Sequence, residues 1–554
     1  MTKILTSNGV ADNNIFTYTS QQWLDDAVIY QVFPTSFKDG NGDGYGDLPG
    51  VISKLPYIAS LGVDALWLSP FYTSPQLDTG YDVKDFRNVD ERYGTLQDFD
   101  TLLKKAHAMG LKVIIDIVPN HTSDQHPWFQ EALASAPGSK ARDRYIFRDG
   151  LGENGELPPN NWDSVFNGGA WKRVEDGQWY MHLFSEHQPD LNWENTEVLD
   201  EFCSILRFWL DRKVDGIRID AAYCLFKQDG YPDVDYTRAS EPGYDPRWDR
   251  DEVLSIYQQW RKVIDEYDGR VMIGEIWGLG VDRIKRYLGS DRMQAAFTFD
   301  FMRIDWAAQN YVKVITESIA GYNEKGANPL WVMNNHDQSR AASRLGLTHP
   351  RLVTGIGPHN EQPNSQLGLR RARATAGMML GLPGGACLFQ GEELGLPDHS
   401  LLEDNYRVDP RWSVSPDRLH DVGRDGTRVP LPWKSNAPAY GFSATGHTWL
   451  PQPDVFRKYA VNRQERDHNS TLSFYRKLLA LRAHYSLGSG ALEWETTDRE
   501  DIVQFSNGNV RVIINFGAVE TKMPEGDLLI CSDNKVKDGD AMLPGNSMAW
   551  LLVY

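Results

Sequence analysis

Near the middle of the chain stands Gly216-Ile217-Arg218-Ile219-Asp220, the stretch around which the fold and the site are organised. Apolar and charged residues alternate along it, so Arg218 and Asp220 lie on one face of a predicted strand. We expect the guanidinium of Arg218 to lower the pKa of Asp220 and to hold that carboxylate ionised, as a nucleophile requires. A buried structural ion pair would give the same pattern, so the rest of the chain decides between the two interpretations.

Three other apolar runs also end in acids, asparagines or histidines. They occupy residues 113–121, 271–275 and 330–337, and their polar ends are Asp116, Asn120, His121, Glu275, Asn334, Asn335, His336 and Asp337. Carboxylates and imidazoles at the carboxyl ends of several parallel strands can converge on one pocket. The pattern therefore favours a catalytic site over an isolated ion pair.

Eight short apolar runs of this kind recur along the chain, separated mostly by amphipathic helical patterns. They begin near residues 28, 63, 113, 216, 271, 296, 330 and 386. One helical pattern starts with a Thr95–Asp98 capping box, carries Met109 on its apolar stripe and ends at Gly110. Eight strand–helix units in alternation predict an α/β protein with a (β/α)8 TIM barrel, whose site lies at the carboxyl ends of the strands.

The spacing of the strands predicts where the barrel is interrupted. We assign residues 1–121 and 190–486 to the catalytic barrel, and residues 122–189, rich in Gly, Asn and Trp, to a subdomain B inserted after strand three. Two further polar excursions cover residues 227–250, predicted as a lid, and residues 393–468.

The last part of the chain changes its period from helical to alternating. Two alternating runs flank Asn507-Gly508, a dipeptide that strongly favours a hairpin turn. Residues 487–554 are therefore predicted to form a small C-terminal antiparallel β domain.

Composition restricts the possible partners. The 554 residues carry a formal net charge of −19, which argues against nucleic acid and anionic membranes, because both attract basic surfaces. The four cysteines are scattered, so neither a disulfide framework nor a zinc site is predicted. Residues 1–23 lack the pattern of a signal peptide, and no apolar run approaches the roughly 20 residues of a membrane span. We therefore expect a soluble, cytoplasmic protein.

Three acids are candidates for paired-carboxylate catalysis of the glycosidase type: Asp220, Glu275 and Asp337. A retaining glycosidase needs one ionised carboxylate to attack the anomeric carbon and one protonated acid, of raised pKa, to protonate the leaving oxygen. Arg218 marks Asp220 as the ionised group. Ile273 and Trp277 share the strand face of Glu275, and this partly apolar setting would favour the protonated acid.

Four motifs at these strand ends resemble those of glycoside hydrolase family 13, the α-amylase superfamily, and the resemblance extends over essentially the whole chain. They are DIVPNH (116–121), GIRIDAA (216–222), GEIW (274–277) and NNHD (334–337). The resemblance implies that Asp220 is the nucleophile, Glu275 the acid/base and Asp337 the carboxylate that orients the sugar hydroxyls. It also implies that His121 and His336 bind the same sugar ring, and Arg218 is counted among the substrate-binding residues.

Three further motifs resemble the α-glucosidase and oligo-1,6-glucosidase branch of that family: QPDLN (188–192), DTGYD (78–82) and GRDGTR (423–428). In such relatives Asp78 and Arg428 grip the non-reducing glucose and close the pocket, which gives exo cleavage of one glucose, and Tyr81 stacks under that ring. A surface ion pair between Asp78 and Arg428 is the alternative interpretation. Relatives that prefer α-1,6 bonds carry valine directly after the nucleophile. Ala221 stands there in this chain, so the resemblance implies a preference for α-1,4, maltose-type bonds.

A loop after the first strand, DGNGDGYGD (39–47), predicts a cation site. Its oxygen-bearing side chains at alternate positions, with glycines between them, suit a hard cation. The pattern departs from an EF-hand, because position twelve is Gly50 rather than Glu, and a plain Gly/Asp turn is the alternative. Family relatives hold a structural calcium or magnesium here. The resemblance therefore implies Ca²⁺ (or Mg²⁺) bound by Asp39, Asn41, Asp43, the carbonyl of Tyr45 and Asp47.

Two other functions are weighed against hydrolysis. A retaining enzyme passes through a glycosyl-enzyme, so the first is a transglucosylase, or a sucrose- or trehalose-active isomerase, on the same scaffold. The RLDRD loop that sucrose isomerases carry after the fourth motif is missing, with SRLG (343–346) nearby, which favours hydrolysis. The second is a non-catalytic relative such as the family's amino-acid-transporter heavy chains, which carry a membrane helix and lack the acids. The expected substrates are small α-glucosides, namely maltose, malto-oligosaccharides or sucrose, and the oligomeric state is not predicted.

Overall fold

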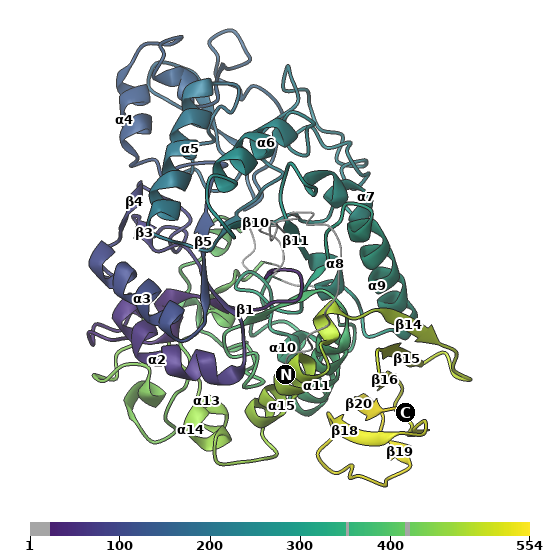
Figure 1. Cartoon of the computed structure of the whole chain (residues 1–554). Coiled ribbons are helices and arrows are strands. Elements are labelled where there is room, and N and C mark those ends of the chain that lie inside the picture. The colour runs from purple at the N-terminus through teal and green to yellow at the C-terminus, as the bar shows by residue number, and fades with distance from the viewer. Residues whose placement is uncertain (1–22, 351–353, 416–420) are drawn as a thin grey trace, which may run out of the picture.

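The computed structural model describes residues 23–350, 354–415 and 421–554, and its centre is a closed barrel of eight parallel strands (Figure 1). The strands lie in the order β1-β13-β12-β11-β10-β9-β5-β2. Their bounds are β1 Val28–Val32, β2 Ala65–Leu68, β5 Lys112–Ile117, β9 Gly216–Ile219, β10 Val271–Gly274, β11 Ala295–Thr298, β12 Leu330–Val332 and β13 Gly385–Phe389. Each strand lies in one of the eight apolar runs of the sequence, so the predicted TIM barrel is confirmed.

Long helices surround the barrel between successive strands (Figure 1). They are α2 Leu48–Leu61, α3 Leu96–Ala108, α5 Thr196–Asp211, α6 Val253–Ile264, α9 Ala308–Asn323, α11 Ser365–Gly381 and α15 Thr471–His484. Helix α3 begins with the predicted Thr95–Asp98 capping box, and Gly110, with φ of 80°, follows its end. Met109 was predicted on the buried stripe, but it is 41% exposed because it is the C-cap, beyond the last helical turn.

The two faces of strand β9 are buried in different apolar layers. Ile217 and Ile219 belong to the large layer between the strands and the surrounding helices. Arg218 points the other way, into the barrel, where its guanidinium lies 5.1 Å from the centre of the Trp67 ring. This alternation is the one that the sequence predicted, and it directs a buried cation toward the strand ends.

Insertions that follow the carboxyl ends of the strands lie over that end of the barrel. Residues 122–189 contain helix α4 and a three-stranded antiparallel sheet of order β6-β8-β7, with the bounds α4 Pro127–Ala134, β6 Phe147–Asp149, β7 Trp171–Arg173 and β8 Gln178–Met181. The segment 227–250 packs on this insertion, since the indole of Trp162 donates to the carbonyl of Pro232 at 2.7 Å. A two-stranded sheet, β3 Tyr72–Thr73 and β4 Asp85–Val89, flanks the loop of residues 78–82.

The C-terminal part is a five-stranded antiparallel sheet of order β14-β15-β16-β20-β18, as predicted. Its strands are β14 Leu492–Glu495, β15 Ile502–Asn507, β16 Val510–Asn515, β18 Asp527–Cys531 and β20 Ser547–Leu552, and β17 Thr521–Lys522 pairs with β19 Met542–Leu543 beside it. The sheet packs on helix α11, because the indole of Trp550 donates to the carbonyl of Gly377 at 2.9 Å. The residue boundaries that the sequence assigned to the domains stay predictions.

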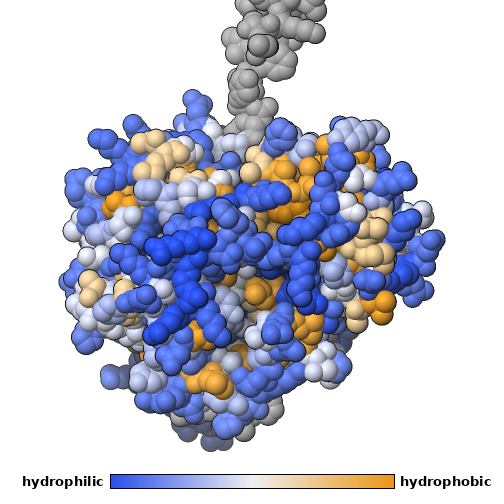
Figure 2. All heavy atoms as spheres, turned by 90° about the horizontal axis from the view of Figure 1, so that it is seen from below, coloured by the Kyte–Doolittle hydropathy of each residue, from blue (hydrophilic) through white to orange (hydrophobic). Residues whose placement is uncertain are grey.

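The surface seen from below is mainly hydrophilic, with apolar residues in separate patches (Figure 2). Among the described residues, no helix is long and apolar enough to cross a membrane. All four cysteines are unpaired thiols. The prediction that the N-terminus lacks a targeting signal rests on residues 1–22, which lie outside the described residues.

Candidate active site

A cavity of about 250 Å³ lies at the carboxyl ends of the barrel strands. The three candidate acids all line it: Asp220 follows β9, Glu275 follows β10 and Asp337 comes after β12. Four other predicted sugar-binding residues also line it, namely Asp78, Tyr81, His121 and Ala221. The remaining three, Arg218, His336 and Arg428, are buried behind its wall.

The guanidinium of Arg218 joins three carboxylates at the floor of the cavity. Its Nη1 lies 2.6 Å from Asp116 and 2.8 Å from Asp220, and its Nη2 lies 2.7 Å from Glu275. The strand register explains the arrangement, because Asp116 on β5 is paired directly with Arg218 on β9, and β10 flanks the other side. Asp220 and Glu275 therefore stand on neighbouring nitrogens of one cation.

The predicted low pKa of Asp220 is wrong in this setting. Burial and the neighbouring Glu275 raise the pKa of Asp220, and Arg218 opposes them only in part. Burial likewise raises the pKa of Asp116 to about 7, although Arg218 is its nearest ion-pair partner. One guanidinium does not offset the burial of both Asp116 and Asp220, so these two carboxyl groups hold a proton to higher pH than free aspartates do.

Glu275 lies in a polar environment, whereas the sequence predicted a partly apolar one. Besides Arg218, it accepts hydrogen bonds from the indole of Trp277 at 2.7 Å and from the backbone N–H of Ala221 at 2.9 Å. Trp277 is fixed by stacking on Phe299, with ring centres 3.9 Å apart. Ala221 has φ of 42°, a left-handed conformation that non-glycine residues adopt rarely and that turns its N–H toward Glu275.

Two histidines support the wall that carries Tyr81. His336 is fully buried, its Nε2 lies 2.7 Å from the Tyr81 hydroxyl, and the two rings stack with centres 5.3 Å apart. Burial lowers the pKa of His336 to about 3, so the imidazole is neutral at pH 7. His121 lines the cavity itself, with its Nε2 3.1 Å from the carbonyl of Tyr81. His336 thus stands behind Tyr81, while His121 is accessible to a ligand.

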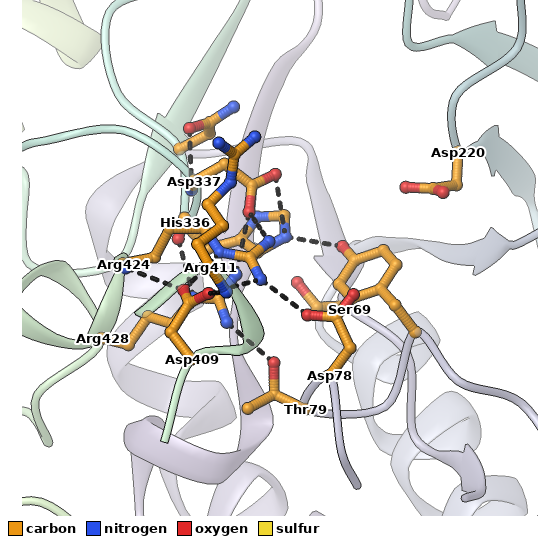
Figure 3. Close-up of polar contacts among 12 residues, drawn as sticks. Ser69, Asp78, Thr79, Asp220, His336, Asp337, Asp409, Arg411, Arg424 and Arg428 are labelled. Atoms are coloured by element: carbon orange, nitrogen blue, oxygen red, sulfur yellow. Dashed lines mark hydrogen bonds and ion pairs between the residues drawn. The ribbon is translucent and has the colours of Figure 1, made fainter. Parts of the chain in front are cut away.

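The closed end of the cavity is built around Arg424, which the sequence analysis did not select. Asp78 pairs with Arg424 at 2.6 Å, so the alternative interpretation, an ion pair between Asp78 and Arg428, does not hold, and their role in gripping the sugar stays a prediction (Figure 3). Arg428 instead binds Asp337 at 2.8 Å and the hydroxyl of Thr79 at 2.8 Å. Arg424 also reaches Asp337, at 3.0 Å. Although burial opposes them, His336 and the two arginines hold the pKa of Asp337 well below its usual range.

Aromatic residues and a second arginine complete the walls, and none was predicted. The side chains come mainly from the insertions and include Phe166, Phe184, Tyr223, Trp277 and Arg411. The centre of the Phe166 ring lies 5.0 Å from the guanidinium group of Arg411 and 5.0 Å from that of Arg424. The one sequence signal for these residues was the unusual number of aromatics, 18 Trp and 24 Tyr.

The loop of the predicted cation site folds around its own backbone. The carboxylate of Asp39 accepts from the N–H groups of Gly42 and Gly44 at 2.6 and 3.0 Å, and Asp47 accepts from Gly50 at 2.6 Å. The side chain of Asn41 donates to Asp43 at 3.0 Å. Within the described part of the chain, no group of three or more His, Cys, Asp or Glu side chains is placed to hold a metal ion. The donors fit a cation only if Asn41 and backbone carbonyls contribute, and the bound cation stays a prediction.

Removing a structural cation is expected to destabilise the fold without changing the catalytic residues. A cation that binds only the native loop stabilises by mass action, about 2.7 kcal/mol when it is present at one hundred times its Kd. Chelator should therefore lower the melting temperature of the purified protein, and added Ca²⁺ or Mg²⁺ should restore it. Elemental analysis that finds no metal, together with a melting temperature indifferent to chelator, would remove this site.

Comparison with known proteins agrees with the geometry of the pocket. Residues 31–490 match the family model "Alpha amylase, catalytic domain". The chain is 37% identical over 524 residues to a "Probable alpha-glucosidase" of Rhizobium meliloti (strain 1021), covering 90% of this chain and 89% of that protein. It is 35% identical over 501 residues to the "Oligo-1,6-glucosidase" of Parageobacillus thermoglucosidasius, covering 84% of each.

The fold also matches that of a solved structure. The trehalulose synthase MutB from Pseudomonas mesoacidophila MX-45 superposes with a TM-score of 0.84 at 30% identity, over 96% of this chain and 99% of that one. The family model covers most of the barrel, and the relatives cover nearly the whole chain. The chain therefore belongs to the α-amylase family, glycoside hydrolase family 13, and is a glycoside hydrolase related to α-glucosidases and oligo-1,6-glucosidases.

Proposed function

We propose that the protein is a retaining, exo-acting α-glucosidase that releases terminal glucose from short oligosaccharides. The observation that carries the proposal is the pair Asp220 and Glu275, held on one guanidinium of Arg218 in a cavity closed at one end by Asp78 and Arg424. We expect the two carboxyl groups, on neighbouring nitrogens of that guanidinium, to stand about 5–5.5 Å apart, a separation that leaves no room for the water that an inverting enzyme places between its two acids.

Asp220 is the nucleophile in this mechanism. It attacks C1 of the terminal glucose while the glycosidic C1–O bond breaks, and Glu275 transfers a proton to the leaving oxygen. The cluster around Arg218 supplies this proton, because burial and the excess of negative charge raise the pKa of Asp116 and of Asp220, and transfer of the proton to Glu275 leaves Asp220 as the ionised carboxylate that attacks. Water then attacks C1 of the glucosyl-enzyme, gives its proton to Glu275 and releases glucose with the α configuration.

The closed end of the cavity supports exo cleavage. Asp78 and Asp337 present carboxylate oxygens there, each fixed by a buried arginine, and Gln188 adds a hydrogen bond to Asp78 at 3.0 Å. Charged acceptors of this kind bind sugar hydroxyls strongly and select one ring in one orientation. Because Asp78, Arg424 and Arg428 are all buried, we expect the cavity to end there, so that a single glucose occupies the non-reducing side of the scissile bond.

A panel of sugars tests this function. We expect maltose to be hydrolysed faster than isomaltose. Ala221 lines the cavity where relatives that prefer α-1,6 bonds carry valine, and alanine leaves more room beside the scissile bond than a branched side chain does. A difference of one or two methyl groups is worth about 1–3 kcal/mol, so the preference should be graded. The measurement is the initial rate on maltose, isomaltose, sucrose and trehalose with all products identified, and faster turnover of isomaltose would contradict the linkage assignment.

The same panel tests the second candidate function, transfer or isomerisation of a glucosyl group. The structural likeness to trehalulose synthase MutB, of which a mutant has also been solved in complex with the substrate sucrose, supports this second candidate. Release of free glucose and fructose from sucrose would indicate hydrolysis. A disaccharide isomer of sucrose as the main product would assign the protein to the isomerases instead.

A further inference from the structure

We propose that Asp409, in the excursion after β13, is a positioning residue for the sugar-binding wall. It acts by fixing Arg424, so the proposal rests on the α-glucosidase function assigned above. Asp409 is not part of any of the motifs that carried the site, and it does not line the cavity. Figure 3 shows it on the far side of Arg424 from Asp78.

The contacts of Asp409 are directed almost entirely at Arg424. Its Oδ2 accepts from the Nε of Arg424 at 2.6 Å and from the Arg424 backbone N–H at 2.7 Å, and its side chain is completely buried. Its Oδ1 accepts from the Nη2 of Arg424 at 3.3 Å and from the backbone N–H of Arg411 at 2.9 Å. Asp409 therefore holds one edge of the guanidinium and the backbone from which the arginine extends.

The other edge of the guanidinium faces the cavity. Its Nη2 binds Asp78 at 2.6 Å, and its Nη1 binds Asp337 at 3.0 Å. Three carboxylates from distant parts of the chain thus fix one planar group, and only Asp409 is out of reach of a sugar in the cavity. A guanidinium held by a bidentate-like contact on one edge is pre-organised for its contacts on the other.

Asp409 should affect Asp78 more than Asp337. Arg424 is the only cation paired with Asp78 among the described residues, whereas Asp337 keeps Arg428 at 2.8 Å. Loosening Arg424 therefore weakens the grip on the terminal glucose and leaves the other carboxylate largely held. Binding lost equally from the ground state and the transition state raises KM and changes kcat little.

The experiment is a double-mutant cycle between Asp409→Asn and Arg424→Gln, measured on p-nitrophenyl α-glucoside. In the otherwise natural chain, Asp409→Asn should raise KM about tenfold and leave kcat within a few-fold, the size expected for one charged hydrogen-bond contact. In the Arg424→Gln background, the same substitution should have no further effect on KM. An Asp409→Asn effect of equal size in both backgrounds would overturn the proposal, because Asp409 would then act on the fold and not through Arg424.

Glucose binding, measured by calorimetry, gives a readout that does not need turnover, and its Kd should rise by the same factor as KM. Asp404→Asn is the control, since this acid lies in the same excursion, its side chain is 67% exposed, and among the described residues its one ion pair is with Arg407; its KM should equal that of the natural chain. If Asp409→Asn does not fold, Asp409→Glu keeps the charge, lengthens the arm and should give a smaller rise in KM. A natural chain active on the glucoside, with KM unchanged in both Asp409 variants, would refute the positioning role alone. A natural chain that binds glucose but cleaves no α-glucoside would refute the proposed function.

Discussion

Asp220→Asn is expected to reduce kcat at least about 10⁴-fold on every α-glucoside, the order of loss seen when an active-site nucleophile is removed. The melting temperature should stay equal to that of the natural chain or rise. Because the folded protein raises the pKa of Asp220, its ionised form is less favourable in the folded state than in the unfolded one, and neutral Asn removes that cost. The strand itself is held by Ile217 and Ile219, which the substitution leaves in place.

Asp215→Asn is the matched control for this result. Asp215 comes directly before β9, at the opposite end of the same strand, and is also buried. It accepts from the backbone N–H of Val113 at 2.9 Å and pairs with His107 at 2.6 Å. Its loss should cost about 1–3 kcal/mol of stability and leave kcat unchanged. Asp220→Asn is therefore expected to remove activity and keep stability, whereas Asp215→Asn should lower stability and keep activity.

The stereochemistry of the natural enzyme checks the same assignment. Proton NMR within seconds of mixing should show the α anomer of glucose before mutarotation adds the β anomer. Appearance of the β anomer first would contradict nucleophilic attack by Asp220. So would an Asp220→Asn variant that keeps a near-natural rate after deamidation has been excluded.

The barrel could be predicted because its signals are local. Each strand is a short apolar run, each helix carries a buried stripe, and capping residues such as Thr95 mark the ends. The positions of the catalytic candidates followed from the same pattern, since the acids end the strands and the carboxyl ends of parallel strands meet. The insertion of residues 122–189 could be predicted because the chain between two strands is longer than one barrel unit needs. The aromatic residues that the insertion contributes to the cavity could not be predicted.

The pKa of Asp220 could not be predicted because its decisive neighbours lie across the sheet. Along the sequence Arg218 has one evident partner, two residues away. In the barrel Asp220 is buried, and register brings Asp116 and Glu275 to the same guanidinium, so burial first and the excess of negative charge second reverse the expected shift of its pKa. Pairing between strands depends on register, which residues within one strand do not determine.

The pairing of Asp78 with Arg424 rather than Arg428 could not be predicted for a similar reason. Both arginines belong to GRDGTR, and a short turn over Asp425–Thr427 separates them. Both point toward the same wall, and both bind Asp337, so the motif fixes the charge of the wall but not the pairing. The pairing is set by Asp409, which lies outside the motif and contacts only the first of the two.

Glu275→Ala is expected to leave an enzyme whose activity an activated substrate and added azide partly restore. General acid assistance is worth about 10²–10⁴-fold, so turnover of maltose, whose leaving group needs a proton, should fall by that factor. An activated substrate such as 2,4-dinitrophenyl α-glucoside needs no protonation, so its first step should stay fast and the glucosyl-enzyme should accumulate as a burst. Azide, which needs no general base, should then speed the second step and give α-glucosyl azide, because attack on the enzyme-bound sugar inverts its configuration a second time.

The companion variant Glu275→Gln separates loss of the acid from loss of its contacts. The Glu275 carboxylate accepts from Arg218, the Ala221 N–H and Trp277. A Gln side chain has one acceptor oxygen and one NH2 group, so its NH2 group would face at least one of these three donors. Gln should therefore lose as much activity on maltose as Ala, respond less to azide because the space is filled, and lower the melting temperature further. Azide that fails to accelerate Glu275→Ala, or that yields the β azide from it, would show that Glu275 is not the acid/base partner of Asp220.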